Sequence, residues 1–507
     1  MQKLEARPTW KLVPLSHARQ RVRFHDASLI ASLWVLLEKM AADESLLRYR
    51  ARRVANGKQQ RRNSDVDLYA PTVRMRTTQI MIFVAAAEGL VDFHGDFEQA
   101  FLHGIDLQSE VYMFPAPGYE SYSPSGELMV YQLIKTIYGL LEGAINWSTR
   151  AVDELTRFGL KQTISDPQLF IRRWDDGSKM LLALYVDDTP GFATAQSHVD
   201  ELTTFMKSRG LIYNIERLTW YQGIQIQRNP ALGLIHMNQG QYVQKLVRKW
   251  DMQDAPPRTL PLPPKVKLLQ MCEDGTPMTT KKPMKSVTAG INWVSTRPEI
   301  DFTTHNLARC MDKATVEVFE IAKDVLPYLN SSPFNGIAYY DVPGWTNILV
   351  AYKDSNHASD LPEDPHSTGS YYIFLNGGVV SSRSKTLEKV STSTTAAEYE
   401  QLYHCTEEVT YIRQLLGEIG VHLHAPTIIY EDNLAAVSLA NNASKIHART
   451  RSMALQLHKI RERIADGIVA VLPVGTNDNI ADVGTKALPR PAFKVHSKCL
   501  SMPFIAP

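Results

Sequence analysis

The stretch LLALYVDDTPG, from Leu181 to Gly191, restricts the fold most strongly because an apolar run leads directly into two adjacent aspartates. A short apolar run of this kind is typical of a buried strand, and the Pro190-Gly191 pair predicts a turn after it. Asp187 and Asp188 are therefore expected at the tip of a hairpin. Neighbouring carboxylates repel each other, so a cation is the expected partner, and a divalent metal ion is the strongest candidate. A solvated turn is the alternative, because Asp is common in turns.

Length and charge set the next limits. The chain has 507 residues, which is too long for one ordinary core and predicts roughly two to four domains. Its net charge is only +2, so the composition as a whole does not indicate nucleic-acid binding. However, the segment RYRARRVANGKQQRR, residues 48–62, concentrates positive charge at Arg50, Arg52, Arg53, Lys58, Arg61 and Arg62. These side chains can neutralise several phosphates, and a solvated surface helix or loop is the alternative.

Cysteine usage and hydropathy bear on the compartment. The four cysteines contain no CxxC pair, so the sequence predicts neither a disulfide framework nor a zinc cluster, and a reducing compartment fits. Apolar stretches such as MIFVAAAEGLV, from Met81, are shorter than the roughly 18 to 20 residues that a membrane span needs. The start of the chain, MQKLEARPTWKL, lacks an apolar signal core. We therefore expect an intracellular, soluble protein without membrane association.

The pattern along the chain predicts distinct regions. Helix-like and strand-like segments alternate up to about Met252, after which DAPPRTLPLPPKVK supplies five prolines and indicates a linker. A mostly helical stretch comes next and includes VEVFEIAKDVLPYL, with Pro298 and Pro327 as expected helix breakers. From about Gly344, strands and helices alternate as in an independent α/β domain. The expected domain limits are 1–255, 256–343 and 344–507.

Acidic residues stand beside several predicted elements. Asp96 comes after an apolar patch and precedes the helix-like AFL, so its carboxylate is expected to meet Asp187 where two strands lie side by side. Further along, two acids are expected at strand ends, one early in a helix and one at the start of the last helix, namely Asp354, Asp432, Glu398 and Asp482. Acids gathered at one edge of a sheet suit a two-metal site for phosphoryl transfer. Each acid taken alone is better explained as a helix cap or turn residue, and only the joint pattern favours metal binding.

Short motifs in a fixed order add a family resemblance. The chain resembles the reverse transcriptase and ribonuclease H portion of copia-type long-terminal-repeat retrotransposon polyproteins over nearly its whole length. The motifs that carry this resemblance are TWKLVPL (9–15), RYRARRVANG (48–57), APTVRMRTT (70–78), DFEQAFLHG (96–104), YGL (138–140), SDPQLF (165–170), YVDD (185–188), TRPEI (296–300), STTAAEY (393–399), EDN (431–433) and ADVGTKALPRPAF (481–493).

The resemblance implies a multidomain fold that combines α/β and α+β parts. A right-hand polymerase with fingers, palm and thumb would be followed by a connection and a ribonuclease H-like α/β domain. The implied activity is an RNA-directed DNA polymerase with ribonuclease H, and each reaction is a two-metal phosphoryl transfer. The implied partners are an RNA template, a DNA or RNA primer, an RNA–DNA hybrid and deoxynucleoside triphosphates. The implied location is the cytoplasm, within a virus-like particle, or the nucleus.

Site residues are carried over by matching motifs. Two sets of acids match the family's metal ligands, Asp96, Asp187 and Asp188 for the polymerase and Asp354, Glu398, Asp432 and Asp482 for the ribonuclease H. The resemblance implies two Mg²⁺ ions per active site, for which Mn²⁺ can substitute. Phe101 matches an aromatic residue that stacks under the incoming sugar and leaves no room for a 2′-hydroxyl, with a simple core aromatic as the alternative. Arg50 and Arg52 match basic finger residues that would contact triphosphate or template phosphates.

The chain departs from the family pattern around both sets of acids. The altered positions are Leu33, Leu141, Glu142, Ala144, Ile145, Thr189, Pro190, Gln222, Ala396, Ser452, Met453 and Ala454. Glu142 is expected to add a negative charge near substrate phosphates, which would weaken binding. The alternative interpretation is therefore a degenerate retrotransposon remnant that keeps the fold and nucleic-acid binding with little or no catalysis.

Overall fold

The computed structural model describes residues 9–40, 46–62, 67–229, 233–340, 347–360, 362–442 and 454–501. The chain forms two compact units. The N-terminal unit contains Met1–Arg74 and Val91–Arg217, and the C-terminal unit contains Met75–Leu90 and Leu218–Pro507. The altered positions Ser452 and Met453 lie outside the described residues. The domain limits expected at residues 255 and 343 remain a prediction.

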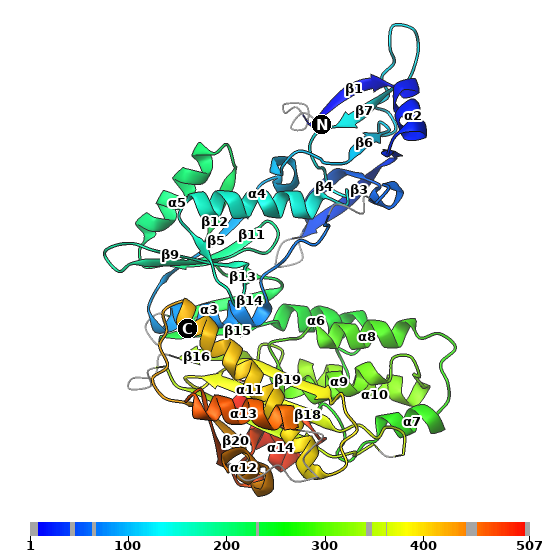
Figure 1. Ribbon diagram of the computed structural model, residues 1–507. Coiled ribbons are helices and arrows are strands. Elements are labelled where there is room, and N and C mark those ends of the chain that lie inside the picture. Colours follow the sequence, from blue (N-terminus) through cyan, green and yellow to red (C-terminus); the bar gives the residue numbers. More distant parts are fainter. Residues whose placement is uncertain are drawn as a thin grey trace. The chain divides into compact units, whose positions relative to one another are not determined.

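The N-terminal unit combines three sheets with helices (Figure 1). A four-stranded sheet has the order β1-β7-β6-β2, formed by β1 (Trp10–Pro14), β2 (Ala27–Ile30), β6 (Glu110–Met113) and β7 (Met129–Leu133). A two-stranded sheet contains β3 (Ser32–Met40) and β4 (Leu46–Ala55). A six-stranded sheet has the order β12-β5-β11-β10-β9-β8, formed by β5 (Val91–Phe97), β8 (Lys161–Gln162), β9 (Leu169–Arg173), β10 (Lys179–Ala183), β11 (Asp188–Ala193) and β12 (Tyr213–Glu216). The helices are α2 (Leu15–Phe24), α4 (Gly143–Arg157) and α5 (Gln196–Ser208), with short 3₁₀ turns η1 (Gly57–Gln59) and η2 (Ala100–His103).

The six-stranded sheet separates apolar from polar side chains because successive residues of a strand point to opposite faces. On β5, Phe93 and Phe97 belong to the core that includes buried residues of α4 and α5. His94 and Asp96 alternate with these rings and therefore point to the other face. The antiparallel pairing of β5 with β11 places Asp188 directly opposite Asp96. The alternation of residues along β5 thus turns Asp96 away from the helix-covered core, and the pairing with β11 places Asp188 beside it.

The turn between β10 and β11 lies earlier than predicted. Tyr185 and Asp188 exchange two backbone hydrogen bonds of 2.9 Å, so Val186 and Asp187 form a two-residue hairpin turn. Asp187 stands at the hairpin tip, as expected. Asp188 instead begins the returning strand.

The turn predicted at Pro190-Gly191 is wrong, because both residues, together with Thr189 before them, lie within β11. Thr189 is fully buried, and its hydroxyl donates to the carbonyl oxygen of Gly95 over 3.0 Å. A Cβ atom at Gly191 would lie 2.2 Å from the ring of Phe93. The glycine is therefore explained by this close approach inside the sheet rather than by a turn.

The C-terminal unit contains two further sheets and most of the helices (Figure 1). One sheet has the order β13-β14-β15-β16, formed by β13 (Trp220–Tyr221), β14 (Ile224–Asn229), β15 (Leu234–Asn238) and β16 (Gly336–Tyr340). The other has the order β19-β18-β17-β20-β21, formed by β17 (Leu349–Asn356), β18 (Thr368–Leu375), β19 (Gly378–Thr386), β20 (Thr427–Glu431) and β21 (Val469–Pro473). The α-helices are α3 (Met75–Ala87), α6 (Gly240–Lys249), α7 (Leu268–Asp274), α8 (Lys282–Asn292), α9 (Asp301–Arg309), α10 (Val316–Asn330), α11 (Thr394–Glu418), α12 (Leu434–Asn441), α13 (Ala454–Ala465) and α14 (Arg490–Leu500). Short 3₁₀ turns are η4 (Pro298–Ile300), η6 (Thr476–Asp478) and η7 (Ile480–Gly484).

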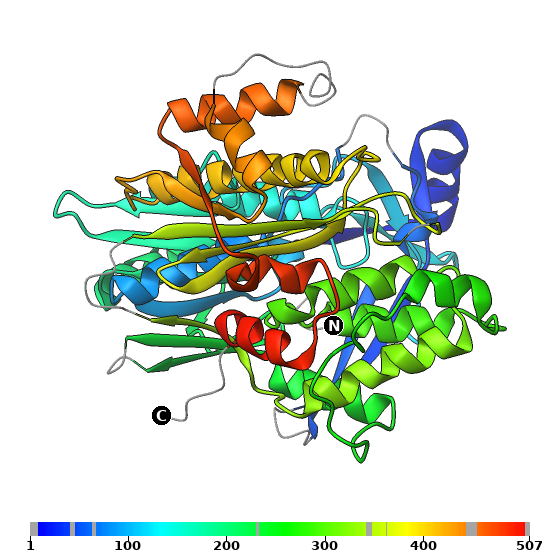
Figure 2. The same cartoon turned by 90° about the horizontal axis from the view of Figure 1, so that it is seen from below.

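The five-stranded sheet has mixed strand directions. β17 pairs antiparallel with β18 and parallel with β20, and β20 pairs parallel with β21. Helix α11 packs along β17 and β18 and, together with α13, covers one face of this sheet (Figure 2). Strands and helices therefore alternate from β17 onward, as the sequence predicts for an α/β domain.

The helical part of this unit shares one large core with the five-stranded sheet. Buried side chains of α8, α9 and α10 share this core with residues of β18 and η7. Pro327 was expected to break a helix but lies inside α10, which continues to Asn330. The residues around it are buried, so core packing offsets the single backbone hydrogen bond that proline cannot donate.

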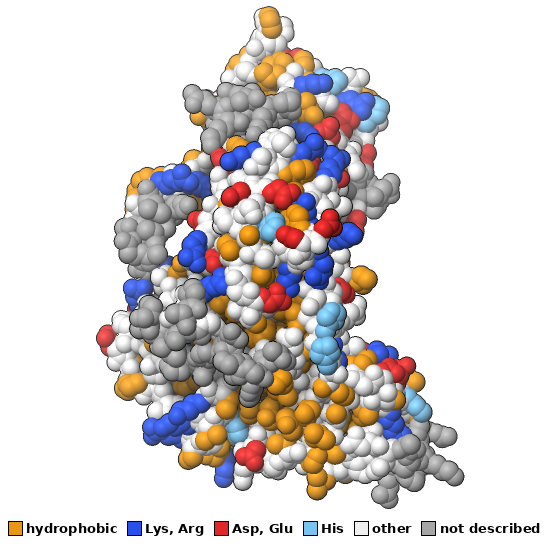
Figure 3. All heavy atoms as spheres, turned by 90° about the vertical axis from the view of Figure 1, so that its left-hand side faces the viewer, with side chains coloured by type: hydrophobic (Ala, Val, Ile, Leu, Met, Phe, Trp, Pro, Cys, Tyr) orange, Lys and Arg blue, Asp and Glu red, His pale blue; other side chains and the backbone are white. Residues whose placement is uncertain are grey.

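Surface charge is mixed rather than uniformly basic. On the face shown in Figure 3, Lys and Arg side chains are interspersed with Asp and Glu, in keeping with the net charge of +2. Among the described residues, no helix combines the length and the apolar character needed to cross a bilayer.

A buried carboxylate in the C-terminal unit predicts a pH-dependent stability. Asp301 lines a cavity of about 220 Å³, and its Oδ2 atom accepts no hydrogen bond from any described residue. Burial raises the pKa of Asp301 to about 7. The folded state therefore favours the protonated carboxyl, and this contribution to stability is present at acidic pH and lost as the pH rises through about 7.

We expect Asp301→Asn to stabilise the protein at pH 8 by about 2–4 kcal/mol, because Asn carries no charge that burial would penalise. At pH 4 the variant should match the parent chain, since Asp301 is then protonated. Denaturant unfolding at the two pH values measures the difference. An equal effect of the substitution at both pH values would contradict the prediction.

Candidate active sites

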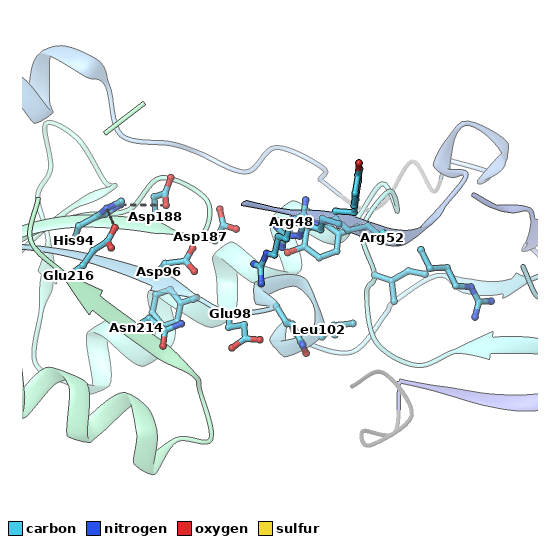
Figure 4. A pocket seen from close by; sticks show the side chains of 18 of the residues that line it. Arg48, Arg52, His94, Asp96, Glu98, Leu102, Asp187, Asp188, Asn214 and Glu216 are labelled. Atoms are coloured by element: carbon cyan, nitrogen blue, oxygen red, sulfur yellow. Dashed lines mark ion pairs between the residues drawn. The ribbon is translucent and has the colours of Figure 1, made fainter. Parts of the chain in front are cut away.

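Three acids of the N-terminal unit line a cleft of about 950 Å³. Asp96 comes from β5, Asp187 from the hairpin turn and Asp188 from the first residue of β11. Strand β4 contributes the basic side chains of Arg48, Arg50 and Arg52 to the same cleft, and these residues alternate along the strand and so share one face. Figure 4 shows Arg48 and Arg52 in this cleft. The cleft thus places carboxylates that can bind a cation near guanidinium groups that can bind phosphates.

The carboxylates in this cleft lack full charge compensation. Burial raises the pKa of Asp96, and the adjacent charge of Asp188 raises it further. Burial also raises the pKa of Asp187, with smaller contributions from Asp188 and Asp96. Arg50 and Arg52 act in the opposite direction but do not cancel these effects. Carboxylates with raised pKa values in a cleft are typical of a site that gains from binding a cation.

His94 is a site residue that the sequence did not indicate. Its Nε2 lies 3.5 Å from Oδ1 of Asp188, and its Nδ1 lies 3.7 Å from Oε1 of Glu216. Burial lowers the pKa of His94, but Asp188 and Glu216 outweigh this effect and raise the pKa above its usual value. The sequence feature that could have indicated His94 is its position two residues before Asp96, which puts both side chains on the same face of β5.

Trp147 holds the turn that carries Asp187. Val186 has a φ of 57°, a left-handed conformation that is unfavourable for a β-branched residue. The indole Nε1 of the fully buried Trp147 donates to the carbonyl oxygen of Val186 over 2.6 Å. The same indole packs edge-on against Phe97, with ring centroids 4.9 Å apart. The helix-covered core is thus connected to the strained turn by one hydrogen bond.

If the cleft catalyses the DNA synthesis that the family resemblance implies, Trp147→Phe should lower its turnover number about 10- to 100-fold, because the variant retains an aromatic ring but releases the turn that positions Asp187. The KM for the nucleotide should stay close to the parental value, and the melting temperature should change only slightly. Steady-state primer extension and thermal unfolding measure these quantities. A variant with the parental turnover number would show that the hydrogen bond does not position the acid.

Phe101 lies near the cleft without lining it. This half-buried residue of η2 packs edge-on against Tyr138, with ring centroids 4.7 Å apart, and Tyr138 lines the cleft. The guanidinium of Arg52 lies 4.8 Å from the centre of the Tyr138 ring. Phe101 therefore supports a cleft wall that includes Tyr138 and Arg52.

Glu142 was expected to place a negative charge near substrate phosphates, but its side chain does not line the cleft. Its side chain is buried, and its Oε2 accepts a hydrogen bond from the backbone N–H of Gln108 over 3.2 Å. The expected negative charge beside substrate phosphates is therefore not found there.

Other altered positions lie in several elements. Leu33 is exposed on β3, Ile145 lies in α4, and the backbone N–H of Ala396 donates to the side chain of the cap residue Ser393. Ala454 is the first residue of α13.

A second group of acids meets at the end of the five-stranded sheet. The parallel register pairs Tyr352 with Tyr430, which brings Asp354 level with Asp432 two residues further on. Glu398 comes from the first turns of α11, as predicted. One carboxylate oxygen from each of Asp354, Glu398 and Asp432 lies within 4.8 Å of the others. These oxygens are suitable ligands for a divalent cation.

Asp482 joins this group from a different element than predicted. It lies in η7 rather than at the start of α14, the last helix. Burial raises its pKa to about 7, and the nearby charge of Asp354 adds to this effect. Nζ of Lys486 forms an ion pair of 2.8 Å with Oδ1 of Asp482. Thr485 donates a hydrogen bond from Oγ1 to Oδ2 of Asp354.

Lys353 is a second site residue that the sequence pattern did not predict. Its fully buried side chain places Nζ 2.6 Å from Oε2 of Glu398, and it forms a second ion pair with the buried Glu431. Burial lowers the pKa of Lys353, but these two carboxylates outweigh burial and raise it. The sequence carried one weak signal, namely that Lys353 shares a strand face with the apolar residues Leu349 and Ala351.

Comparison with known proteins identifies the family. A model of the family "Reverse transcriptase (RNA-dependent DNA polymerase)" matches residues 9–264. The Pol polyprotein of transposon RE1 from Arabidopsis thaliana is 30% identical over 489 residues, covering 96% of this chain and 32% of that protein. The Pol polyprotein of transposon TNT 1-94 from Nicotiana tabacum is 29% identical over 511 residues, covering 99% of this chain and 37% of that protein. The chain thus spans about a third of the length of these relatives.

Among solved structures, the foamy viral protease-reverse transcriptase in complex with double-stranded DNA aligns with a TM-score of 0.44 at 13% identity, covering 84% of this chain and 63% of that chain. A similarity at this level carries no conclusion about function. The family match and the mixed helix-and-strand units confirm the predicted fold class of a multidomain reverse transcriptase. The chain belongs to the reverse transcriptase (RNA-dependent DNA polymerase) family and is similar to the Pol polyproteins of copia-type retrotransposons.

Proposed function

We propose that this chain is an RNA-directed DNA polymerase with an associated ribonuclease H. The polymerase activity is proposed because Asp96, Asp187 and Asp188 line the same cleft as the basic side chains of strand β4. All these residues lie within the segment matched by the family model, residues 9–264. An RNA template, a primer and a deoxynucleoside triphosphate are the proposed ligands, and Arg50 and Arg52 would bind their phosphates.

The donor set of the cleft fits divalent metal ions. Asp96 and Asp187 would hold two Mg²⁺ ions, with Asp188 beside them, and carboxylate oxygens suit Mn²⁺ equally well. When bound, the ions would lower the pKa of the primer 3′-hydroxyl and neutralise charge on the triphosphate. His94 would orient Asp188, since its imidazole lies 3.5 Å from that carboxylate.

The proposed ribonuclease H belongs to residues 344–507, and residues 1–255 and 256–343 would form the polymerase and its connection. Its support is the cluster of Asp354, Glu398 and Asp432 at one end of a sheet, with Asp482 adjacent. The substrate would be the RNA strand of an RNA–DNA hybrid, recognised by its 2′-hydroxyls and minor-groove shape. An intracellular location is part of this proposal, in a cytoplasmic virus-like particle or in the nucleus.

The experiment that tests the proposed function is primer extension on poly(rA)–oligo(dT) with the full chain and Mg²⁺. We expect incorporation of deoxythymidine nucleotides that stops when the metal is chelated. Template–primer binding is measured in parallel by fluorescence anisotropy. Binding without extension in either Mg²⁺ or Mn²⁺ would reject polymerase activity and favour the degenerate remnant.

Sugar selection gives a further prediction about Phe101. If this ring and Tyr138 form the wall below the incoming sugar, Phe101→Ala should admit ribonucleotides by removing the contact that excludes a 2′-hydroxyl. We expect the preference for deoxy- over ribonucleotides to fall about tenfold or more, because rejection by shape alone is worth roughly 1–3 kcal/mol. Single-nucleotide incorporation kinetics give the ratio. An unchanged ratio would identify Phe101 as a core residue only.

A further inference from the structure

The cavity beside Asp301 is separate from both acid clusters. Its lining residues come from α3, α8, η4, α9, β16 and β19, all within the C-terminal unit, and include none of the proposed metal ligands. Its volume of about 220 Å³ is several times the roughly 30 Å³ that one water molecule occupies. It is also below the roughly 300 Å³ of the smallest pockets for drug-sized ligands. The cavity can therefore admit a small organic molecule.

Asp301 brings an uncompensated carboxylate to this cavity. It is the first residue of α9, and no cationic side chain among the described residues pairs with it. The hydroxyl of Ser382 donates a hydrogen bond to the carboxylate, but Oδ2 has no partner in the part of the chain that the structure describes. Burial and the nearby charge of Glu299 both raise the pKa of Asp301. The start of a helix favours an acid at this position but leaves Oδ2 without a hydrogen-bond donor.

Arg76 also lines the cavity, but its charge is already balanced. Its guanidinium forms an ion pair with Oε2 of Glu408, and Oε1 of Glu408 accepts a hydrogen bond from the hydroxyl of Ser381 over 2.8 Å. Arg76 makes no resolved contribution to the pKa of Asp301, whereas Glu299 does. The cavity wall at Asp301 therefore keeps a net negative character that would attract a cation.

Gln79 supplies a second polar group to the cavity. Its side chain is only 8% exposed, and its amide forms no hydrogen bond with a described residue. Such an amide can both donate and accept. Ile300, Ile337 and Val379 are buried and give the cavity an apolar lining. Apolar walls with a few uncommitted polar groups are typical of small-molecule sites.

We propose that this cavity binds a small planar cation of the amidinium or guanidinium class, held by the carboxylate of Asp301 and the amide of Gln79. Such a cation presents several N–H donors in one plane to a carboxylate, and its flat faces can lie against apolar side chains. It would also compensate a buried charge that otherwise destabilises the fold. The inference does not depend on the proposed function, because no proposed metal ligand lines the cavity.

Isothermal titration calorimetry of the full chain with benzamidinium chloride at pH 8 tests this inference. We expect saturable binding of one benzamidinium per chain, and the neutral benzamide, which has a similar shape, should bind at least about tenfold more weakly. Benzamidinium should also raise the melting temperature, because it binds the folded state. Absence of saturable benzamidinium binding, or equal affinity for the two probes, would overturn the inference.

Substitutions locate the binding site. Asp301→Asn should weaken benzamidinium binding at least about tenfold, because it removes the charge of the acceptor. This variant is expected to be more stable than the parent chain at pH 8, so unfolding would not explain the loss. Gln79→Met retains the side-chain length without the amide and should weaken binding about threefold or more. The matched control is Asp312→Asn, since the side chain of Asp312 is 84% exposed outside the cavity, and it should bind like the parent chain. Parental affinity in Asp301→Asn would reject the cavity as the binding site.

Discussion

Asp187→Asn should reduce DNA synthesis by about 100-fold or more while leaving template–primer binding nearly unchanged. Asn retains the size of the side chain at the hairpin tip but removes the charge that would hold the metal ion. The magnitude is a lower limit, because even outer partners of metal ligands typically contribute about 10- to 100-fold. Primer extension measures the rate, and fluorescence anisotropy measures binding.

The matched control for this variant is Glu98→Gln. Glu98 lines the same cleft, and its substitution by Gln removes the same negative charge, but Glu98 is not among the proposed metal ligands. Its rate should stay within a few-fold of the parent chain. Equal losses in both variants would mean that general electrostatics of the cleft, rather than a ligand at Asp187, controls synthesis. Full activity of Asp187→Asn would remove this residue from the proposed site.

The second large effect is expected for Asp354→Asn, which should abolish cleavage of the RNA strand of a hybrid and leave DNA synthesis unchanged. The charge of Asp354 acts on Lys486, but Lys486 also pairs with Asp482 and its side chain is 40% exposed, so the substitution leaves no buried cation without a partner. Asn can still accept the hydrogen bond from Thr485. A loss of about 100-fold or more would therefore report on metal binding rather than on folding.

Glu400→Gln provides the control in the C-terminal unit. Glu400 lies two residues after Glu398 on α11 and accepts hydrogen bonds from the backbone N–H groups of Glu388 and Lys389. Gln retains an acceptor oxygen there, so cleavage should persist. Gel analysis of a labelled hybrid in Mg²⁺ and Mn²⁺ measures both variants. Cleavage by Asp354→Asn at the parental rate would contradict the role proposed for the acid cluster.

Several features of both sites could be predicted from the sequence because they depend on local patterns. The apolar run before Asp187 indicates a buried strand whichever neighbours it has, and the alternation around Asp96 defines one face of β5. In the same way, apolar strands lead directly to Asp354 and Asp432, and parallel pairing then brings them level. Periodicity and chain direction were sufficient in these cases. The ordered motifs added the family, which the comparisons confirm.

Other features depend on residues far apart in the sequence, and only the tertiary structure decided them. Pro190 and Gly191 predict a turn locally, yet β11 continues through them because β5 and β10 pair with it on either side and Phe93 covers the glycine. Lys353 resembles an ordinary surface charge in the sequence, and only the packed fold brings Glu398 and Glu431 to it from two other elements. A sequence thus determines which side chains share a face of a strand. Packing between elements determines which charges meet, because the low dielectric of the interior makes each buried charge depend on its partners.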